Sequence, residues 1–460
     1  MAEKRNPLKV SLILTNEVQI RSWLSRRSIQ AITSQFELSI YVPDSLQRKS
    51  LSYESKILKL NYYKVPERKD LERNLLAYLI TSHLRWSSFR RRFKYEFLNQ
   101  GNFISVLYLI KSVLRSTKRN NMLLWMALSK RYRNAIYGET RKELEKLSFT
   151  INPCDMIIVV SNCSDLANEI AIQSANNCQK PLIQVVENWD NLSSKLCPSK
   201  NPKKLIVWGQ QTKNYAIEIH DVKPEMVVAL GGPRLPNREK ISNLEFSHRH
   251  SKFENGIIRV FYPGYGGENE DEKYLSILHA EISREFPDFS ILIRFRPHPL
   301  SIKAKGKNYY SNWPSYIEID FPKIQHERGL DWPKLDDSVY STMLQSDLVI
   351  GTPSTFLLEA MLFNLPIILD LRRSNPRFHS HRNRFLTATH FNEILSDKRI
   401  PRFNHDSEIG KITRSAFVGR EDYSSLTDFL VYNDENDFVE RLVTLLNEDS
   451  NLDRSMDNCS

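Results

Sequence analysis

Short apolar runs rich in branched side chains alternate with amphipathic stretches along the first half of the chain. Runs of this kind predict buried β-strands, and the amphipathic stretches predict helices. We expect strands at residues 9–15, 36–42, 156–161, 181–186, 205–208 and 226–230. We expect helices between them, at residues 20–33, 166–173 and 214–220. Because parallel strands need a crossover connection, commonly a helix, this rhythm predicts a doubly wound parallel sheet.

A second set of apolar runs predicts a second sheet, and 460 residues suffice for two cores. Its strands are expected at residues 256–262, 291–295, 348–351 and 366–369. The polar residues before it show little periodicity, and the last apolar stripe, Phe438, Leu442 and Leu445, predicts a helix over Asp434–Asn447. We therefore predict a first α/β domain over residues 1–235, a linker over 236–255, a second α/β domain over 256–433, and a C-terminal helix and tail over 434–460.

The stretch from residue 71 to residue 146 is helical in pattern and strongly basic, and we interpret it as a helical insertion in the first domain. Between Arg85 and Lys146 it holds fifteen Lys or Arg against four Asp or Glu, which equals the net charge of +11 of the whole chain. Such a patch favours an anionic partner, which could be a membrane surface, a phosphorylated acceptor or a nucleic acid. A solvated helical face is the alternative. No motif of interleaved aromatic and basic residues accompanies the charge, so we expect no nucleic acid.

Cysteine usage and hydropathy indicate the compartment. The five cysteines form no C-x-x-C pair, which argues against a disulfide framework or a structural zinc site. The apolar run Val10–Leu14 is too short for the core of a signal peptide, and no run reaches the length of a membrane span. We expect a cytoplasmic protein that is peripheral at the inner face of the membrane through residues 85–146.

Three loops in the second domain follow predicted strands at their carboxyl ends, where ligands bind in open parallel sheets. The first holds the glycines Gly264, Gly266 and Gly267 between a strand and a helix. Glycines allow backbone N–H groups to approach a diphosphate closely, with a helix N-terminus behind them. An ordinary tight turn would use the same residues.

The second loop presents a histidine between two prolines. Pro297 and Pro299 fix the backbone around His298, whose imidazole could donate to a phosphate oxygen or protonate a leaving phosphate. Arg296 could add a bidentate phosphate contact. The alternative is a rigid surface turn whose histidine faces solvent.

The third loop leads into a helix. Thr352 followed by Pro353 predicts the N-cap and first residue of this helix, with Ser354 and Thr355 in the first turn. Hydroxyl groups beside the positive end of a helix form an anion site, although the same residues could simply cap it. Glu359, one turn further, could accept hydrogen bonds from ribose hydroxyls or be a solvated helix charge.

The first domain offers two carboxylates after the predicted strand at residues 181–186. Glu187 or Asp190 could act as a general base on an acceptor hydroxyl. An Asx-rich turn that caps the next helix accounts for them equally well.

Several of these residues resemble bacterial GT-B enzymes of surface-polysaccharide assembly. The groups concerned are the CDP-glycerol glycerophosphotransferases and the sialyl- and Kdo-transferase-like enzymes, which share an R-x-H-P element and a later S-D…S-[ST]…E-A…P element. In this chain the elements are Arg296-Pro297-His298-Pro299, Ser346-Asp347, Pro353-Ser354-Thr355, Glu359-Ala360 and Leu365-Pro366. A further segment, Trp189 to Lys195, is similar to a W-D-N-[LT]-[TS]-[TS]-K segment of a related glycosyltransferase-like set.

The resemblance implies a GT-B-like α/β fold, with two Rossmann-like doubly wound domains facing a cleft. It places the donor nucleotide in the second domain, with His298, Ser354 and Thr355 at its phosphates and Glu359 near its ribose. It implies no metal or other cofactor. The residues agree with this, since Asp336-Asp337 precede a predicted helix and fit a cap better than a metal motif.

Three hypotheses for the function remain open on the sequence. The first is a transferase that moves a sugar or polyol phosphate from a nucleotide-activated donor to a glycan or lipid-linked acceptor, in capsule or lipopolysaccharide synthesis. The second is a non-hydrolysing nucleotide-sugar 2-epimerase, which would need no acceptor. The third is a non-enzymatic binder of anionic polymers, suggested by the charge alone.

Overall fold

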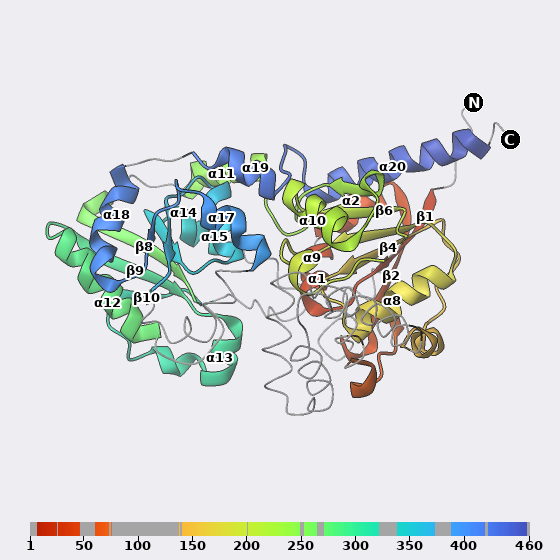
Figure 1. The fold of residues 1–460 in the computed structure, drawn as a ribbon, viewed down its shortest axis with the longest axis horizontal. Coiled ribbons are helices and arrows are strands. Elements are labelled where there is room, and N and C mark those ends of the chain that lie inside the picture. Colours follow the sequence, from red (N-terminus) through yellow and green to blue (C-terminus); the bar gives the residue numbers. More distant parts are fainter. Residues whose placement is uncertain are drawn as a thin grey trace, which may run out of the picture. The chain divides into compact units, whose positions relative to one another are not determined.

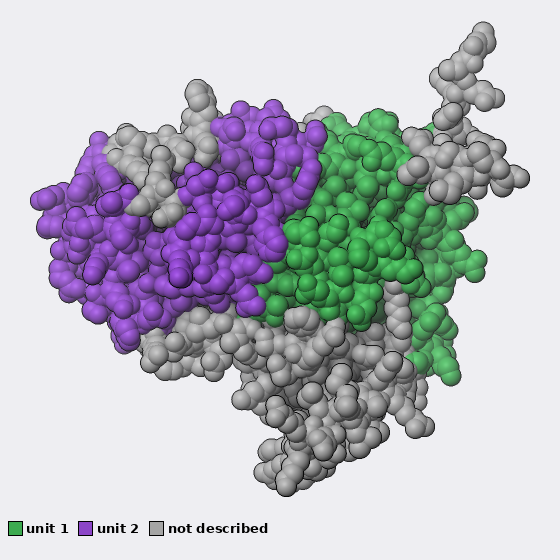
Figure 2. All heavy atoms as spheres, turned by 45° about the horizontal axis from the view of Figure 1, so that its top comes forward, with its two compact units in different colours: residues 1–233, 388–390, 438–460 green, residues 234–387, 391–437 purple. Residues whose placement is uncertain are grey.

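The chain forms two compact units (Figure 2). The computed structural model describes residues 7–24, 26–46, 60–72, 75, 138, 140–199, 201–248, 253–264, 271–321, 338–372, 388–418 and 422–457. Unit 1 comprises residues 1–233, 388–390 and 438–460, and unit 2 comprises residues 234–387 and 391–437. Most of the basic region at 71–146 lies outside the described residues. In the described part of the chain, no helix is long and apolar enough to cross a membrane.

Unit 1 is built on a seven-stranded sheet in which every strand is parallel to its neighbours (Figure 1). Its strands are β1 (Leu8–Ile13), β2 (Phe36–Pro43), β3 (Leu60–Tyr63), β4 (Met156–Ser161), β5 (Leu182–Val186), β6 (Lys204–Val207) and β7 (Val227–Ala229). The order β3-β2-β1-β4-β5-β6-β7 is that of a doubly wound Rossmann-like sheet. Strands β4 and β5 are buried at every position, as expected when helices cover both faces.

The helices of unit 1 come from both ends of the chain. They are α1 (Glu17–Trp23), α2 (Arg26–Thr33), α8 (Leu166–Asn177), α9 (Asn191–Ser194), α10 (Gln210–His220) and α20 (Phe438–Asp457), with the short 3-10 helices η1 (Asp44–Leu46) and η3 (Pro224–Met226). The C-terminal helix α20 starts four residues later than the expected Asp434 and joins the first unit. The reason lies in its packing, since Phe438 meets the buried ring of Trp23 edge-on, with 5.5 Å between the ring centroids.

Unit 2 repeats the architecture with six parallel strands (Figure 1). They are β8 (Ile257–Pro263), β9 (Ser290–Arg296), β10 (Ile317–Ile319), β11 (Leu348–Gly351), β12 (Ile367–Asp370) and β13 (Arg402–Phe403), in the order β10-β9-β8-β11-β12-β13. The helices are α11 (Arg238–His248), α12 (Asp271–Glu285), α13 (Pro299–Lys305), α14 (Ser338–Leu344), α15 (Thr355–Leu362), α17 (Asn392–Ser396), α18 (Ile409–Val418) and α19 (Ser424–Leu430). The 3-10 helices are η4 (Glu254–Gly256), η5 (Lys307–Tyr310) and η7 (Asp406–Glu408), while η6 (Thr389–Phe391) has its first two residues in unit 1 and its last in unit 2. The expected α/β class with two Rossmann-like sheets is confirmed.

The segment at 236–255, expected to be a linker, contains the helix α11. Asn237 starts it, because its side chain accepts a hydrogen bond from the backbone N–H of Lys240 at 2.8 Å. Asn237 also donates its amide to the carbonyl of Glu435 at 2.6 Å, which joins the segment to the far end of the unit 2 chain. Ile241 is buried. A helix therefore forms here despite the polar composition, stabilised by the Asn237 cap and by burial of Ile241.

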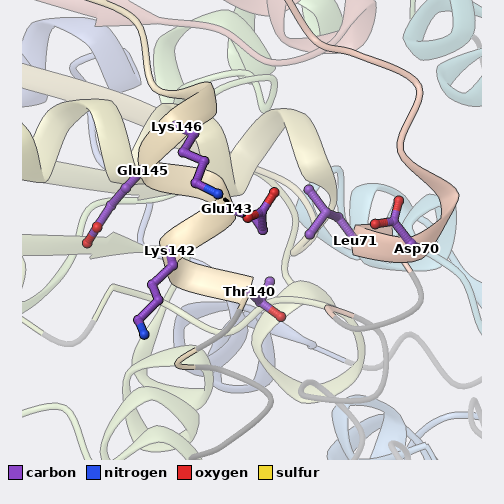
Figure 3. A pocket seen from close by; sticks show the side chains of 7 residues that line it. All are labelled: Asp70, Leu71, Thr140, Lys142, Glu143, Glu145 and Lys146. Carbon is purple, nitrogen blue, oxygen red and sulfur yellow. Dashed lines mark hydrogen bonds and ion pairs between the residues drawn. The ribbon is translucent and has the colours of Figure 1, made fainter.

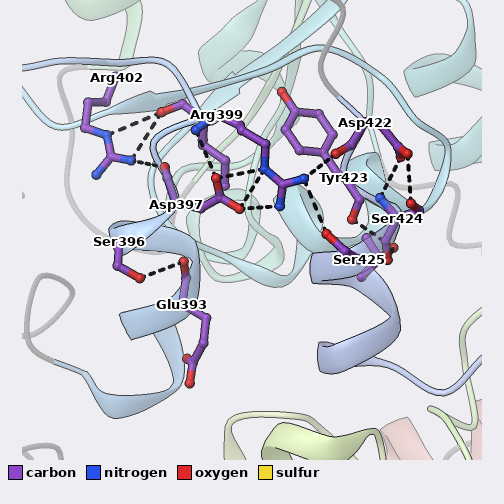
Figure 4. Close-up of polar contacts among 11 residues, drawn as sticks. Glu393, Ser396, Asp397, Arg399, Arg402, Asp422, Tyr423, Ser424 and Ser425 are labelled. Atoms are coloured by element: carbon purple, nitrogen blue, oxygen red, sulfur yellow. Dashed lines mark hydrogen bonds and ion pairs between the residues drawn. The ribbon is translucent and has the colours of Figure 1, made fainter.

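An arginine clamp holds the end of unit 2 together (Figure 4). Arg399 forms a bidentate contact with Asp397 and donates to the carbonyl of Asp422 at 2.6 Å, next to the start of α19. Arg402 donates to the carbonyl of Asp397 at 2.5 Å, just after α17 ends. The clamp thus ties α17 and β13 to α19, and α19 packs on α15.

Candidate functional site

The strand order of unit 2 defines where a ligand can enter. From β8 the sheet runs to β9 and β10 on one side and to β11, β12 and β13 on the other. The switch point therefore lies between the carboxyl ends of β8 and β11, where the crossover connections leave toward opposite faces of the sheet. Gly264 follows β8 there, and Thr352, Pro353 and Ser354 follow β11. The first and third loops selected from the sequence thus lie at one edge of the sheet.

Gly264 sits where no side chain fits. Its N–H donates to the carbonyl of Arg296 at 2.7 Å, and a Cβ would lie 2.9 Å from that oxygen and from the ring of Phe295. At the end of β11, a Cβ on Gly351 would meet the ring of Pro263 at 3.2 Å. Close packing of strand ends therefore requires glycine at Gly264, whatever binds nearby. Gly266 and Gly267 lie outside the described residues.

Gly264→Ala is expected to separate the ends of β8 and β9 and to destabilise the protein by about 1–3 kcal/mol, as overpacked sites do. Gly138→Ala is the control, because a Cβ there meets nothing within 4 Å. Thermal unfolding of both variants tests this, and equal melting temperatures would contradict the steric argument.

The N-terminus of α15 presents a hydroxyl group to the switch point. Ser354 is the N-cap, with extended backbone angles (φ −159°, ψ 168°), and the helix begins at Thr355. The prediction that Thr352 is the N-cap is wrong by two residues, because Thr352 and Pro353 still belong to the bend after β11. The Ser354 Oγ does not cap its own helix, and within the described residues it has no hydrogen-bond partner although it is buried. This leaves the hydroxyl for an anion, together with first-turn N–H groups other than that of Leu357, which donates to the Ser354 carbonyl at 3.2 Å.

Two arginines and a buried glutamate lie around this helix. Glu359 on α15 is only 5% exposed and pairs with Arg234 at 3.5 Å, so it is not a solvated charge. Burial raises the pKa of Glu359, while Arg234 and Arg296 act in the opposite direction. Arg296, at the end of β9, is buried and pairs with Asp320 at 2.7 Å. The electrostatic influence of both arginines on Glu359 places two cations near the switch point.

Arg234 and Asp320 belong to this arrangement, and the sequence did not single them out. Arg234 follows Gly231-Gly232-Pro233, a turn signal without chemical information, and Asp320 follows the three-residue strand β10. Their place at the site becomes visible only through their ion pairs with residues distant in the sequence, Arg234 with Glu359 and Asp320 with Arg296.

His298 lies between β9 and α13 and is partly buried. Its carbonyl accepts hydrogen bonds from the N–H groups of Ser301 and Ile302, at 2.9 and 3.1 Å, and so starts α13. The backbone around His298 is therefore held by the helix as well as by the prolines. The role of its ring at a phosphate remains a prediction.

The two candidate bases of unit 1 differ in environment. Glu187 directly follows β5 and is 2% exposed. Its backbone carbonyl accepts a hydrogen bond from the indole N–H of Trp208 at 3.0 Å. Asp190 is about one third exposed and pairs with Lys195 at 3.4 Å. Asp190 precedes α9 without a side-chain cap bond, so the simple capping interpretation does not account for its carboxylate.

The segment around Trp189 mainly supports another part of the chain by packing. Trp189, Leu192 and Ser193 are buried, and onto them fits the short returning stretch Ala388–His390, which belongs to unit 1. Ser193 Oγ lies 2.8 Å from His390 Nδ1, and the ring of His390 meets Trp189 edge-on at 5.3 Å. The W-D-N segment thus anchors a part of the chain that comes from far away in the sequence.

This anchoring extends to the backbone of the returning stretch. Gln211 donates its amide to the carbonyl of His390 at 3.2 Å, and Tyr215 donates its hydroxyl to the carbonyl of Thr389 at 3.0 Å. Both donors are on α10. Side chains of α10 therefore satisfy buried carbonyls, as buried backbone groups require.

A pocket elsewhere in unit 1 does not coincide with any predicted site residue (Figure 3). Its lining comes from the chain after β3 and from the helical residues 140–147. Lys142 and Lys146 lie there with a slight excess of acids, Asp70, Glu143 and Glu145, and Lys146 pairs with Glu143 at 2.6 Å. This mixed lining carries no net positive charge for an anionic ligand.

The described residues contain no group of three or more His, Cys, Asp or Glu side chains that could hold a metal ion. No protein-family model matches the chain, and no curated protein matches it. Among solved structures, the chain is similar to a protein designated a UDP-N-acetylglucosamine 2-epimerase from Listeria monocytogenes, with 10% identity, a TM-score of 0.48 and 95% of each chain covered.

Two further solved structures show a similar degree of likeness. The UDP-GlcNAc 2-epimerase of Methanocaldococcus jannaschii has 12% identity and a TM-score of 0.44, over 96% of this chain and 100% of that chain. A variant of the wall teichoic acid polymerase TagF has 11% identity and a TM-score of 0.45, over 97% of this chain and 90% of that chain. The strands and side chains described above define the class of this protein as an α/β protein with two parallel Rossmann-like sheets.

Proposed function

We propose that unit 2 binds a nucleotide-activated donor through its phosphates, at the carboxyl ends of β8, β9 and β11. One observation carries the proposal: the buried Ser354 hydroxyl, without a partner in the described part of the chain, lies at the N-terminus of α15, the helix whose Glu359 is influenced by Arg234 and Arg296. A phosphate is an acceptor-rich anion, so it suits a hydroxyl, first-turn N–H groups and nearby guanidinium groups together.

The same groups suit the departure of a nucleotide. When the bond to the donor breaks, negative charge develops on the leaving phosphate, and preorganised donors stabilise it there. We assign the phosphates to Ser354, Thr355 and the first-turn N–H groups, and protonation of the leaving phosphate to His298. Glu359 is fixed by Arg234 and is assigned to ribose hydroxyls. These roles need no metal ion.

We propose further that the protein is a GT-B glycosyltransferase or polyol-phosphate transferase. The motif resemblance around Arg296, His298, Ser354 and Glu359 supports this. So does the position of these residues at or after the carboxyl ends of β9 and β11, the two strands on either side of β8 in one sheet. The acceptor would be a cell-surface glycan or a lipid-linked saccharide. An epimerase would interconvert two nucleotide sugars without an acceptor, so product analysis separates the two activities.

Thermal unfolding with a panel of CDP-, CMP-, UDP-, GDP- and TDP-linked donors tests the proposal, with and without Mg²⁺. A ligand that binds only the folded state raises the melting temperature in proportion to RT ln(1 + [L]/Kd). One donor class is expected to stabilise the protein without Mg²⁺. Ser354→Ala is expected to weaken its binding about tenfold or more, because hydrogen bonds to charged groups contribute about 1.5–3 kcal/mol.

Ser415→Ala is the matched control, since Ser415 is exposed on α18 and bonds only its own helix, to the carbonyl of Ile412. The His298→Ala variant is measured in the same way, by thermal unfolding with each donor. No stabilisation by any donor would overturn the proposal. Stabilisation that Ser354→Ala leaves unchanged would move the phosphate site away from α15.

A further inference from the structure

One segment of unit 2 contains basic residues and no acidic ones. Residues 297–317, which run from the end of β9 through α13 and η5 to β10 (Figure 1), hold three lysines and neither Asp nor Glu. These lysines are Lys303, Lys305 and Lys307. The acids at positions 318 and 320, which follow the segment, are paired with Arg294 and Arg296. Among the residues that the structure describes, the three lysines have no ion-pair partner, so their charge is not compensated.

Aromatic rings lie beside these lysines. Tyr309 is 39% exposed, and few large hydrophobic side chains in the described part of the chain are as exposed. Lys305 Nζ lies over its ring, 4.1 Å from the centroid, and the ring of Trp313 meets it edge-on at 6.0 Å. Lys307 Nζ lies 5.3 Å from the ring centroid of Phe321. Cations and rings thus share one surface, which we call the basic aromatic ridge: Lys303, Lys305, Lys307, Tyr309 and Trp313.

The core of unit 2 supports this ridge from below. Trp313 stacks on the fully buried Phe295 of β9, with 5.4 Å between the ring centroids. Tyr310 is buried as well and lies 5.0 Å from Trp313. At Gly306, where α13 ends, a positive φ of 77° turns the chain, so that Lys305 returns over η5. A surface that is already formed loses little conformational entropy when a partner binds.

The chemistry of the ridge fits an anionic lipid surface. Lysine side chains are attracted to acidic headgroups, and Tyr and Trp rings prefer the interface between headgroups and acyl chains. A single-stranded nucleic acid fits less well, because its successive bases stack on open ring faces. Here Lys305 covers one face of Tyr309, Phe295 covers one face of Trp313, and the planes of Tyr309 and Trp313 stand at 73° to each other.

We propose that the basic aromatic ridge docks unit 2 on an anionic phospholipid membrane. The three lysines contact the headgroup phosphates, and the rings of Tyr309 and Trp313 lie at the level of the headgroups. The inference concerns unit 2 alone and stands without the proposed donor site. Because the basic residues 85–146 favour an anionic partner too, the experiments compare variants in which that region is unchanged.

The first experiment measures flotation of the full-length protein with vesicles of phosphatidylcholine, with and without phosphatidylglycerol. A lysine at an anionic bilayer strengthens binding about fivefold. The triple variant Lys303→Ala, Lys305→Ala, Lys307→Ala is therefore expected to bind the phosphatidylglycerol vesicles on the order of 100-fold more weakly than the parent protein.

The matched control removes the same charge elsewhere. Lys223, Lys398 and Lys411 are exposed and lie outside the ridge, and all three are replaced by alanine. Binding of this variant is expected to change no more than a few-fold, because charges farther from the bilayer than about 10 Å are screened by salt. Thermal unfolding of both triple variants establishes that each is folded.

The second experiment locates the ridge at the bilayer by tryptophan fluorescence. A spin label on the lipid headgroup quenches tryptophans that lie close to the membrane surface. Trp313→Phe is expected to remove a measurable part of the quenching that the parent protein shows with phosphatidylglycerol vesicles. Trp23→Phe is the control, since Trp23 is buried in unit 1 and its indole N–H has no hydrogen-bond partner within the described residues. Its quenching is expected to equal that of the parent protein.

The outcomes decide the proposal without any donor. Parent-like vesicle binding by the ridge variant overturns it, and so does quenching that Trp313→Phe leaves unchanged. A parent protein that binds neither kind of vesicle overturns it as well. A ridge variant that keeps vesicle binding but loses binding to single-stranded DNA at the same salt would assign the ridge to nucleic acid instead.

Discussion

Arg372→Met is expected to destabilise the protein by about 3–5 kcal/mol, the range for removing one partner of a buried ion pair. Arg372 and Asp370 both have fully buried side chains, and they are joined by hydrogen bonds of 2.6 and 2.9 Å. Burial alone would lower the pKa of Arg372, but the Asp370 carboxylate raises it above its usual value. Without the guanidinium group, Asp370 would remain as a buried charge whose remaining hydrogen-bond donors are neutral, the hydroxyl of Tyr262 at 3.1 Å and the backbone N–H of residue 372 at 3.2 Å.

The environment of Arg372 explains why the loss is not recovered by water. Its guanidinium group lies over the rings of Tyr274 and Phe403, at 5.1 and 5.5 Å from their centroids. The double variant Asp370→Leu with Arg372→Met removes both charges and is expected to recover much of the stability. Unfolding in guanidinium chloride measures the stability of both variants.

Arg399→Met is the control for a partly exposed ion pair. The Arg399 side chain is 35% exposed, and exposed pairs contribute about 1 kcal/mol or less. Its contact with the Asp422 carbonyl adds to this, so a loss clearly smaller than that of Arg372→Met is expected. Equal losses in the two variants would show that burial does not set the strength of these contacts.

Trp189→Ala is expected to cost about 3–5 kcal/mol, the range for truncating a buried aromatic side chain. Trp189 is 1% exposed and supports the ring of His390. Its removal leaves a cavity under the returning stretch Ala388–His390. Thermal unfolding should show a large drop in melting temperature, while binding of the donor nucleotide to the folded protein should be retained.

Asp190→Asn separates the structural role of this segment from a catalytic one. Asp190 is about one third exposed, and its pair with Lys195 predicts a loss of about 1 kcal/mol or less. If Asp190 is a general base, Asp190→Asn loses kcat by about 10²-fold or more. Such a loss with normal stability would support a catalytic role of the W-D-N segment, and unchanged turnover would leave Asp190 with a structural role alone.

Most strands could be predicted from the sequence because they are continuous runs of apolar residues. Strands β4 and β5 are buried at every residue, and β11 and β12 likewise. The sequence did not predict β3, β10 or β13, which have four, three and two residues and lie toward the sheet edges. Their partners define them, since none of the three is a continuous run of buried apolar residues.

The candidate site was predictable only in part, for the same reason. Loops after parallel strands can be placed at one edge of a sheet, so the neighbourhood of Gly264 and Ser354 followed from local patterns. Arg234 and Asp320 could not be selected from the sequence, because their importance comes from the pairing that distant residues provide. Glu359 could be named, but its burial and its pairing with Arg234 needed the tertiary structure.

The sequence alone determined the α/β class, the doubly wound rhythm and the loops that end the central strands, because these depend on periodicity and on residues adjacent in the chain. Only the tertiary structure decided that Ala388–His390 and the C-terminal helix α20 complete unit 1. That assignment depends on contacts such as Ser193 with His390 and Trp23 with Phe438, whose partners lie 197 residues apart in the first pair and at opposite ends of the chain in the second. Local patterns show that such side chains will be buried, whereas the fold decides against which partners.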